Sequence, residues 1–346
     1  MKEKWCEESL NNIPVMGNLI KNNCLEFLHK NDLKAKILIN FTHGLGDCID
    51  YSIVIKHLKN ACSNLIIDVV THPGHQWALQ GFADNVFTVV KKLNKDYDFV
   101  FKEEFVYPKL NPNWGIIDPS FNVPPTKVTY TLLENFKIKP KRELYYCSFN
   151  PSDFAKASID KLHKDVIKNH KYAVINYMGS TNRADKDLTH DEAKQICDIL
   201  LNQGYLCIIA DYFNNCPFAN EKDIISINKS HLPWLWRGEP DCGVLYELIN
   251  RANIFVGIDS GPAHVAIATK TPTYVIWMEK GYHPLVAFNF ANNCTHIIPN
   301  AFMHCDTFFS KEYKWLNYGI RNDLIRTLNY GIRNDLIRTL NQIKEP

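Results

Sequence analysis

The sequence predicts an α/β protein of two doubly wound units that face each other across a cleft. Short apolar runs, each long enough for one buried strand, alternate with helical patterns in two separate blocks of the chain. In each block a strand leads into a turn that contains glycine and polar residues. Since open parallel sheets bind ligands at the carboxyl ends of their strands, these turns are the candidate sites.

The first block begins with a buried strand over Lys36 to Phe41. A glycine turn follows, and then a helical pattern covers Cys48 to Asn60. Further strands are predicted at Leu65 to Thr71, Asn85 to Val90 and Tyr97 to Phe101, with a helix over Gly74 to Gly81. The stretch from Tyr107 to Pro125 is rich in Pro, Asn and Trp, which indicates a loop.

The second block begins with a strand and turn over Tyr172 to Ser180. A helix is predicted over His190 to Asn202, with Thr189 as its N-cap. Further strands are predicted at Tyr205 to Asp211, Ile254 to Asp259 and Thr273 to Trp277, with a helix over Val244 to Ala252. We therefore expect an N-terminal extension (1–35), a first Rossmann-like unit (36–155), a second one (156–310) and a C-terminal helical tail (311–346).

The tail contains a duplication, because Leu316 to Thr327 recurs without change as Leu328 to Thr339. Two copies are too few to stack into a solenoid. On a helix, twelve residues advance by about 1200°, so the second copy cannot present the same face as the first. We expect only one copy to pack fully, with the other extending or fraying the terminal helix.

Composition excludes several classes of function. A formal charge of +2 gives no general reason to expect nucleic acid as a partner. No apolar run approaches the ~20 residues of a membrane helix, and the N-terminus does not resemble a secretory signal. The eleven cysteines include no C-x-x-C pair, which favours reduced thiols in a cytoplasmic protein over a zinc ribbon or a disulfide framework. Metal binding at the fragments His72-x-x-His75 and Cys294-x-His296 is disfavoured.

The first candidate turn contains Gly44, Gly46 and Asp47. Glycines here let a ligand approach the backbone, and the following helix start offers N–H groups to anions. A dinucleotide fingerprint needs a third glycine where this chain has Ile49, so a nicotinamide enzyme is weakly supported. Asp68 also lies inside a strand, not at its exit. Asp47 is either a helix cap or a carboxylate that accepts a proton from a substrate hydroxyl at the cleft.

Two candidate turns lie in the second block. The first has Ser180 and Thr181, with Lys186 shortly after. Hydroxyls, loop amides and a cation suit a diphosphate, although a polar loop with a solvated lysine is equally compatible. The other turn follows the strand that ends at Asp259 and continues through Ser260 and Gly261 to His264. This turn could bind a phosphate and ribose hydroxyls. Alternatively, Asp259 only caps the end of the strand and His264 is a buried structural histidine.

In this order, the three turns resemble glycosyltransferase family 9, whose best-known members are the ADP-heptose:lipopolysaccharide heptosyltransferases. The family opens with a strand, a Gly-Asp turn and a helix, matched here by Ile37 to Lys59. Its second half has Asp-Ser/Thr-Gly-x-x-His, then small residues and a proline, matched by Val256 to Trp277. Its Gly-Ser/Thr turn with a downstream lysine is matched loosely by Ile175 to Lys186. The resemblance runs from about Ile37 to Pro299 and is weak from Val106 to Asp165.

The resemblance implies the GT-B fold, in which two Rossmann-like domains face each other across a cleft. It implies transfer of a hexosyl or heptosyl group from a nucleotide-diphosphate donor to a hydroxyl, with inversion and without a metal, as in lipopolysaccharide biosynthesis. The donor is a co-substrate and not a bound cofactor, and in the best-known members it is ADP-heptose. The acceptor is a glycan or a glycolipid.

The resemblance also implies roles for single residues. Asp47 is the general base, the hydroxyls and lysine of the Ser180 turn hold the diphosphate, and the residues after Ile258 shape the nucleotide side of the donor pocket. The expected donor-binding residues are Gly44, Gly46, Ser180, Thr181, Lys186, Asp259, Ser260, Gly261 and His264. No residue is expected to bind a metal.

Departures from the family pattern leave other functions open. The stretch from Gly17 to Lys30 predicts an amphipathic helix, for which packing on the first unit is favoured over contact with a partner or the inner membrane surface. The aromatic stretch His231 to Pro240 and the insertion Tyr282 to Pro284 leave the base and sugar of the donor undetermined. The alternatives are a nucleotide-sugar epimerase or NAD-type enzyme on a similar scaffold, and a non-catalytic nucleotide-sugar-binding protein.

Overall fold

The computed structural model consists of two compact α/β units, one built mainly from residues up to Ser152 and the other mainly from Asp153 onward. The residues that the structure describes are 34–88, 97–107, 123, 126–179, 186–211, 215–219, 221–228, 242–278, 293–299, 314–318, 327–328 and 332. The predicted amphipathic helix, the aromatic stretch His231 to Pro240, and the candidate residues Ser180 and Thr181 lie outside them. Within these ranges no helix is both long and apolar enough to cross a bilayer.

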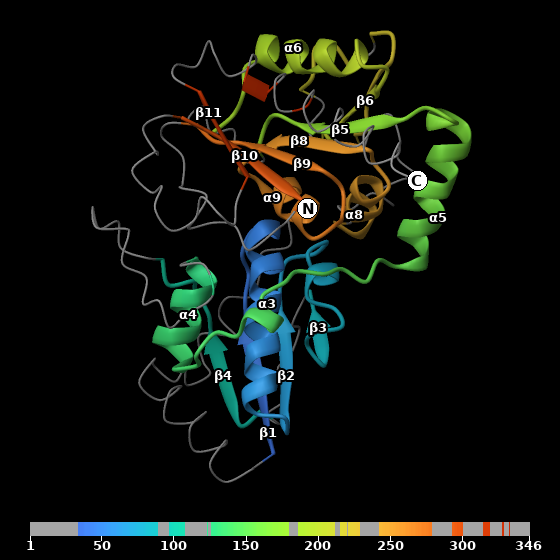
Figure 1. The fold of residues 1–346 in the computed structure, drawn as a ribbon. Coiled ribbons are helices and arrows are strands. Elements are labelled where there is room, and N and C mark those ends of the chain that lie inside the picture. Colours follow the sequence, from blue (N-terminus) through green and yellow to red (C-terminus); the bar gives the residue numbers. More distant parts are fainter. Residues whose placement is uncertain are drawn as a thin grey trace, which may run out of the picture. The chain divides into compact units, whose positions relative to one another are not determined.

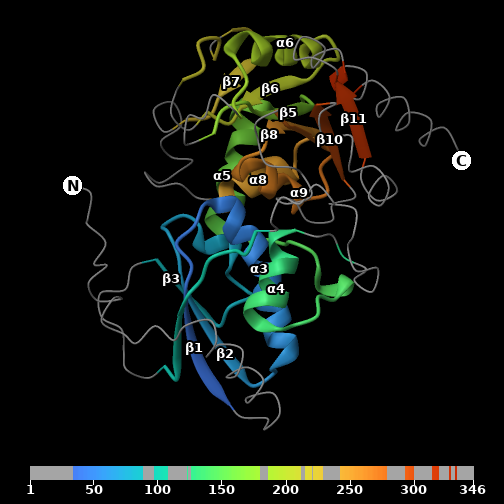
Figure 2. The ribbon, with the colours of Figure 1, turned by 90° about the vertical axis from the view of Figure 1, so that its left-hand side faces the viewer.

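The first unit has a parallel sheet with α3 and α4 on one face (Figures 1 and 2). Its elements are β1 (Ala35–Asn40), α3 (Leu45–Ala61), β2 (Leu65–Val70), the short 3-10 helix η1 (Gln76–Ala78), β3 (Asn85–Phe87), β4 (Phe99–Lys102), α4 (Lys127–Phe136) and the 3-10 helix η2 (Arg142–Leu144). The described strands have the order β3-β2-β1-β4. The order reverses between β1 and β4, which is the point where such sheets bind ligands.

Helix α3 is buried on almost every side, which explains why it lacks a polar face. Even His57 is only 1% exposed. The backbone N–H of Lys141 donates to His57 Nε2 at 2.9 Å, so the ring proton lies on Nδ1, 2.8 Å from the carbonyl oxygen of Ile53. Burial lowers the pKa of His57, which agrees with a neutral ring that ties α3 to the chain after α4.

The second unit is doubly wound, with α6 on one face of its sheet and α8 and α9 on the other (Figures 1 and 2). Its elements are α5 (Asp153–Leu162), the π-helical turn η3 (His163–Ile167), β5 (Tyr172–Asn176), α6 (His190–Leu201), β6 (Leu206–Ile209), β7 (Ile224–Ser226), α8 (Cys242–Asn250), β8 (Ile254–Ile258), α9 (Gly261–Ile267), β9 (Thr273–Ile276), β10 (Cys294–Pro299) and β11 (Lys314–Tyr318). The described strands are all parallel, in the order β11-β10-β9-β8-β5-β6-β7. Here the order reverses between β5 and β8.

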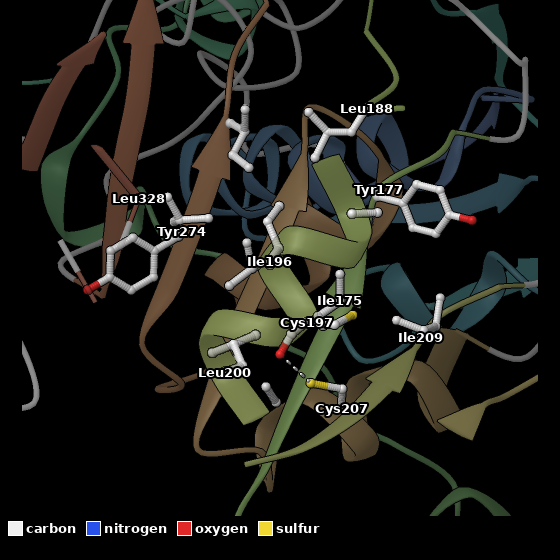
Figure 3. Close-up of a cluster of buried hydrophobic side chains, with 14 of the residues drawn as sticks. Ile175, Tyr177, Leu188, Ile196, Cys197, Leu200, Cys207, Ile209, Tyr274 and Leu328 are labelled. Carbon is white, nitrogen blue, oxygen red and sulfur yellow. Dashed lines mark hydrogen bonds between the residues drawn. The ribbon is translucent and has the colours of Figure 1, made fainter. Parts of the chain in front are cut away.

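The core of the second unit is formed by apolar side chains of the sheet and of α6 (Figure 3). Every residue of β5 and β8 is buried, as expected for parallel strands that are covered on both faces. Thr189 caps α6 as predicted, and the side chain of Glu192 completes a capping box. The sulfur of Cys207 lies 3.7 Å from the carbonyl oxygen of Cys197 inside this core.

Each strand predicted from the sequence overlaps a strand of the structure, but the helix predicted over Gly74 to Gly81 is wrong. Only the 3-10 helix η1 forms there. Gly74 and Gly81 both have positive φ, at 86° and 91°, so each end of the segment is a turn and too few residues remain for an α-helix. The sequence analysis also missed α4, α5, β7, β10 and β11.

Both copies of the duplicated segment contribute to the second unit. Leu316–Tyr318 of the first copy form part of β11, so the tail is not helical throughout. Leu328 and Ile332 of the second copy are 0% and 1% exposed and belong to the core. Leu328 is helical, whereas its counterpart Leu316 lies in a strand. Tertiary contacts therefore override local propensity in these identical residues.

We predict that Leu328→Ala lowers the free energy of unfolding by about 2–5 kcal/mol, the usual cost of emptying a core site. Deletion of 328–339 is expected to cost at least as much, because it returns Leu340 to the position of Leu328 but puts Lys344 at the buried position of Ile332. Thermal denaturation of both variants measures the difference, and we expect activity of the deletion variant to stay within a few-fold of wild type. A deletion variant as stable as the wild type would contradict the assignment of Leu328 and Ile332 to the core.

Gly257 in β8 has no room for a side chain. A Cβ atom there would lie 2.7 Å from two ring atoms of Phe255, a residue that is 0% exposed. We predict that Gly257→Ala destabilises the protein by about 1–3 kcal/mol, as overpacked cores do. Gly179→Ala is the matched control, since its Cβ would meet nothing closer than 3.5 Å. Equal denaturation midpoints for the two variants would contradict this account.

Candidate active site

Asp47 lies in the first turn of α3, just after the carboxyl end of β1. Gly44 is the N-cap, so Asp47 is the third residue of the helix and the N-cap interpretation of Asp47 is wrong. The φ of Gly44 is −60°, which any residue adopts. A Cβ at Gly44 would lie 3.7 Å from Asp47 Oδ2. This is an ordinary contact distance, so an alanine would also fit there, and Gly46 is buried in the same turn.

The other oxygen of Asp47 is bound by Lys127, the first residue of α4. Lys127 Nζ lies 2.6 Å from Asp47 Oδ1 and 3.0 Å from Asp50 Oδ2. Asp47 and Asp50 are three residues apart on α3, so both carboxylates point to the same side of the helix. The side chain of Asp47 is 26% exposed, whereas those of Lys127 and Asp50 are 5% and 0% exposed.

The ammonium group of Lys127 is buried, yet it stays charged. Burial alone would lower the pKa of Lys127, but the carboxylates of Asp50 and Asp47 raise it well above its ordinary value. The ammonium also lies 4.8 Å from the ring centre of Phe105, which packs edge-on against Phe41. A cation over an aromatic face gains further electrostatic attraction.

Two histidines lie at the turn before α3. His43 Nε2 is 2.9 Å from the carbonyl oxygen of Glu103, and His75 Nδ1 is 3.1 Å from the carbonyl oxygen of His43. Burial lowers the pKa of His75, and the charge of Asp47 opposes that shift. His75 therefore lies within electrostatic range of the Asp47 carboxylate. In the described part of the chain, no group of three or more His, Cys, Asp or Glu side chains is arranged to hold a metal ion.

Cys48, next to Asp47, is not available as a nucleophile. Its sulfur lies 3.3 Å from Thr71 Oγ1 and is fully buried. Burial raises the pKa of its thiol to about 12, so the reactive thiolate is scarce at neutral pH. Asp47 is thus the group at this turn with both a charge and access to solvent.

In the second unit, the structure brings Lys186 and Asp259 together at the carboxyl ends of β5 and β8. Lys186 Nζ lies 2.5 Å from Asp259 Oδ2, and the two side chains are 16% and 9% exposed. These are the lysine expected to hold a diphosphate and the acid expected to contact the nucleotide side of the donor. The pair lies where the strand order reverses, as ligand sites in such sheets do.

Asn176 connects three strand ends at this edge. Ser260 Oγ donates to Asn176 Oδ1 at 2.6 Å, and Asn176 Nδ2 donates to the carbonyl oxygens of Met178 at 3.1 Å and Ala210 at 3.4 Å. Ser260 makes no capping hydrogen bond to α9, so its hydroxyl fixes the β8 exit to the β5 exit instead. Asp187 accepts the backbone N–H of Gly179 at 2.8 Å and places Lys186 next to this edge.

The remaining candidates of the second unit lie on α9. Gly261 is its first residue, and His264 is only 4% exposed. Their expected contacts with a nucleotide stay predictions. Sequence reasoning missed Lys127, Asp50, Asn176 and Asp187. Lys127 is eighty positions from Asp47, in a region without a recognisable motif, so no sequence signal linked the two.

Comparisons with known proteins give a family match over part of the chain. Residues 132–280 match the family described as glycosyltransferase family 9 (heptosyltransferase). That range holds the donor-side candidates of the second unit and leaves out Asp47 and Lys127. No match was found among curated proteins.

Several solved structures share the fold. A glycosyltransferase family 9 protein from Veillonella parvula DSM 2008 is 14% identical with a TM-score of 0.54, over 77% of this chain and 86% of that one. The E. coli ADP-heptose lipopolysaccharide heptosyltransferase II is 14% identical with a TM-score of 0.56, over 75% and 89%. The iron-containing dodecameric glycosyltransferase TibC from enterotoxigenic E. coli H10407 is 12% identical with a TM-score of 0.51, over 76% and 65%. The chain thus shares the GT-B fold of these glycosyltransferases, and residues 132–280 match the family 9 model.

Proposed function

We propose that the protein transfers a sugar from a nucleoside diphosphate to a hydroxyl of a glycan or glycolipid acceptor, with inversion and without a metal ion. The observation that carries this proposal is the state of the Asp47 carboxylate. One of its oxygens is held by a buried ammonium group, and its side chain is 26% exposed. A fixed and accessible carboxylate is what a general base for a hydroxyl requires.

The reaction is a single displacement. Asp47 Oδ2 accepts the proton of the acceptor hydroxyl while the hydroxyl oxygen bonds to the anomeric carbon. The bond from that carbon to the diphosphate oxygen breaks, and the departing nucleoside diphosphate keeps the electron pair. Because attack comes from the side opposite the leaving group, the configuration inverts. Cys48 is buried with a raised pKa, so it does not offer a nucleophile for a two-step route that would retain configuration.

The leaving diphosphate needs positive charge that is already in place. Lys186 supplies it in this proposal, together with the hydroxyls of Ser180 and Thr181. In the structure Lys186 is paired with Asp259, so its charge is held at the strand edge before a donor binds. Donor phosphates would compete with Asp259 for the ammonium group, and Asp259 would then be free to accept hydrogen bonds from donor hydroxyls.

ADP-heptose is the first donor to test, because the E. coli heptosyltransferase II of the same fold is named for it. The acceptor to pair with it is lipopolysaccharide core that lacks heptose. A panel of other nucleotide sugars tests the remaining donors. Release of nucleoside diphosphate, measured with and without acceptor, separates transfer from hydrolysis of the donor.

We predict that Asp47→Asn lowers kcat by about 10²–10⁴-fold, the usual contribution of a positioned base, and leaves the affinity for ADP unchanged. Asp191→Asn is the control, because Asp191 is an exposed acid in the first turn of α6. Steady-state kinetics and calorimetric titration of ADP measure the two quantities. Full turnover by Asp47→Asn would remove Asp47 as the base and with it this mechanism.

We also predict that EDTA treatment leaves turnover unchanged, and that added Mg²⁺ or Fe²⁺ does not raise it, since Lys186 meets the leaving charge. Metal analysis of the purified protein by mass spectrometry accompanies the assay, because TibC, which shares the fold, contains iron. Loss of activity with EDTA that returns with one metal would replace the metal-free route by a metal-assisted one.

A further inference from the structure

We propose that Lys127, with Asp50 as a second anion, is the positioning residue that holds Asp47 in place and lets it change charge during the reaction. This inference rests on the proposed role of Asp47 as the base. Its geometry is independent of that role, since one ammonium lies within 3.0 Å of both carboxylates. The rest of the argument concerns what fixes this ammonium and why two acids share it.

Lys127 is held rigidly at the start of α4. The hydroxyl of the buried Tyr145 bonds to Thr126, which precedes Lys127, and lies 3.0 Å from Thr129 Oγ1 in the first turn of the same helix. Farther along α4, Thr131 Oγ1 accepts the backbone N–H of Val106 at 2.9 Å, which fixes the helix to the exit of β4. Since the helix cannot shift freely, the ammonium position is set by the fold.

The second anion explains how the base can be neutralised at low cost. When Asp47 accepts a proton, it stops balancing the charge of Lys127. A buried ammonium without a counter-ion is strongly unfavourable. Asp50 is 0% exposed and lies 3.0 Å from the same ammonium, so a counter-ion remains throughout the proton transfer. Lys127 thus holds the Asp47 carboxylate before the reaction, and Asp50 stays next to the ammonium when Asp47 takes the proton.

Other titratable groups face this cluster. His75 lies near Asp47, and its own pKa is lowered by burial. Tyr107 helps to raise the pKa of Lys127, and the charge of Asp50 helps to raise the pKa of Tyr145. The charge of Asp47 raises the pKa of the Cys48 thiol, and that of Lys127 lowers it. Burial raises the pKa of both Tyr145 and Cys48, so neither titrates in the acidic range. His75 remains, and a His75→Gln background removes its contribution.

The test compares two variants that shift the titration of Asp47 in opposite directions. In Asp50→Asn, protonation of Asp47 leaves Lys127 without an acid partner, so the midpoint moves to lower pH. In the double variant Lys127→Met with Asp50→Asn, the cation is gone and no buried acid loses it, so the midpoint moves to higher pH. Carbon-13 NMR of labelled aspartate follows the Asp47 carboxyl, which is assigned by its absence in Asp47→Asn. Midpoints that stay unchanged or move together overturn the proposal.

Kinetics with ADP-heptose and heptose-free lipopolysaccharide core supply the second readout. We expect kcat of the double variant to fall about tenfold or more, a part of what a positioned base contributes, with KM for ADP-heptose unchanged. Lys127→Arg is expected to restore part of kcat, because it keeps the charge. Lys194→Met is the control, since Lys194 forms an exposed pair with Asp198 at 2.5 Å on α6. A rise in KM with kcat unchanged contradicts a positioning role.

The outcomes separate this inference from the proposed function. If Asp47→Asn remains fully active, the mechanism fails, whatever the NMR midpoints are. If Asp47→Asn is inactive but the midpoints do not move in opposite directions, the positioning role of Lys127 alone fails. Because the titration needs no substrate, it gives a result even if ADP-heptose is not the donor.

Discussion

The reversal of strand order in each parallel sheet is the constraint on which the site arrangement depends. A parallel sheet needs crossover connections, and at the reversal the connections of neighbouring strands leave in opposite directions. The space between them is lined by strand ends. In the first unit, this places the turn after β1 next to the exit of β4, and so brings Asp47 near residues that follow β4. In the second unit, it places the exits of β5 and β8 side by side, with Lys186 and Asp259 at the edge.

The two units use lysine differently because they bury it to different degrees. Lys127 is almost fully buried and has two acids, so it is fixed and its charge is permanent. Lys186 is paired with Asp259 and is 16% exposed, so a competing anion can reach it. Taking a charge out of water costs several kcal/mol unless partners replace the solvent. The deeper lysine therefore depends on its acid partners, whereas the shallower one can exchange a partner for a ligand.

The sequence predicted the class of fold because the buried strands are short and uniformly apolar. β1, β5 and β8 each end at a polar turn, and these turns also carried the resemblance to the family. Thr189 could be predicted as a cap because its side chain acts on a neighbouring backbone N–H and on Glu192 three residues away. These signals are local, so one sequence contains them in full.

The contacts that the sequence could not predict are those between distant segments. Lys127 meets Asp47 through the packing of α4 on α3, and nothing in the residues around Lys127 marks it as part of a site. The sequence predicted Asn176 only as a strand residue. Its hydrogen bonds join the ends of neighbouring strands through Ala210 and Ser260, which are distant in the sequence. Gly74 and Gly81 show the converse. Their positive φ angles end a segment whose composition suits a helix.

The duplicated tail has a consequence for anyone who aligns this chain with a relative that has a single copy. Pairing with β10 selects Leu316–Tyr318 as the equivalent residues, whereas burial in the core selects Leu328 and Ile332. The two possible alignments pair the relative with identical residue types, so no substitution score can choose between them. Residue equivalence in this tail is therefore a property of three-dimensional position, and it is divided between two stretches of one polypeptide.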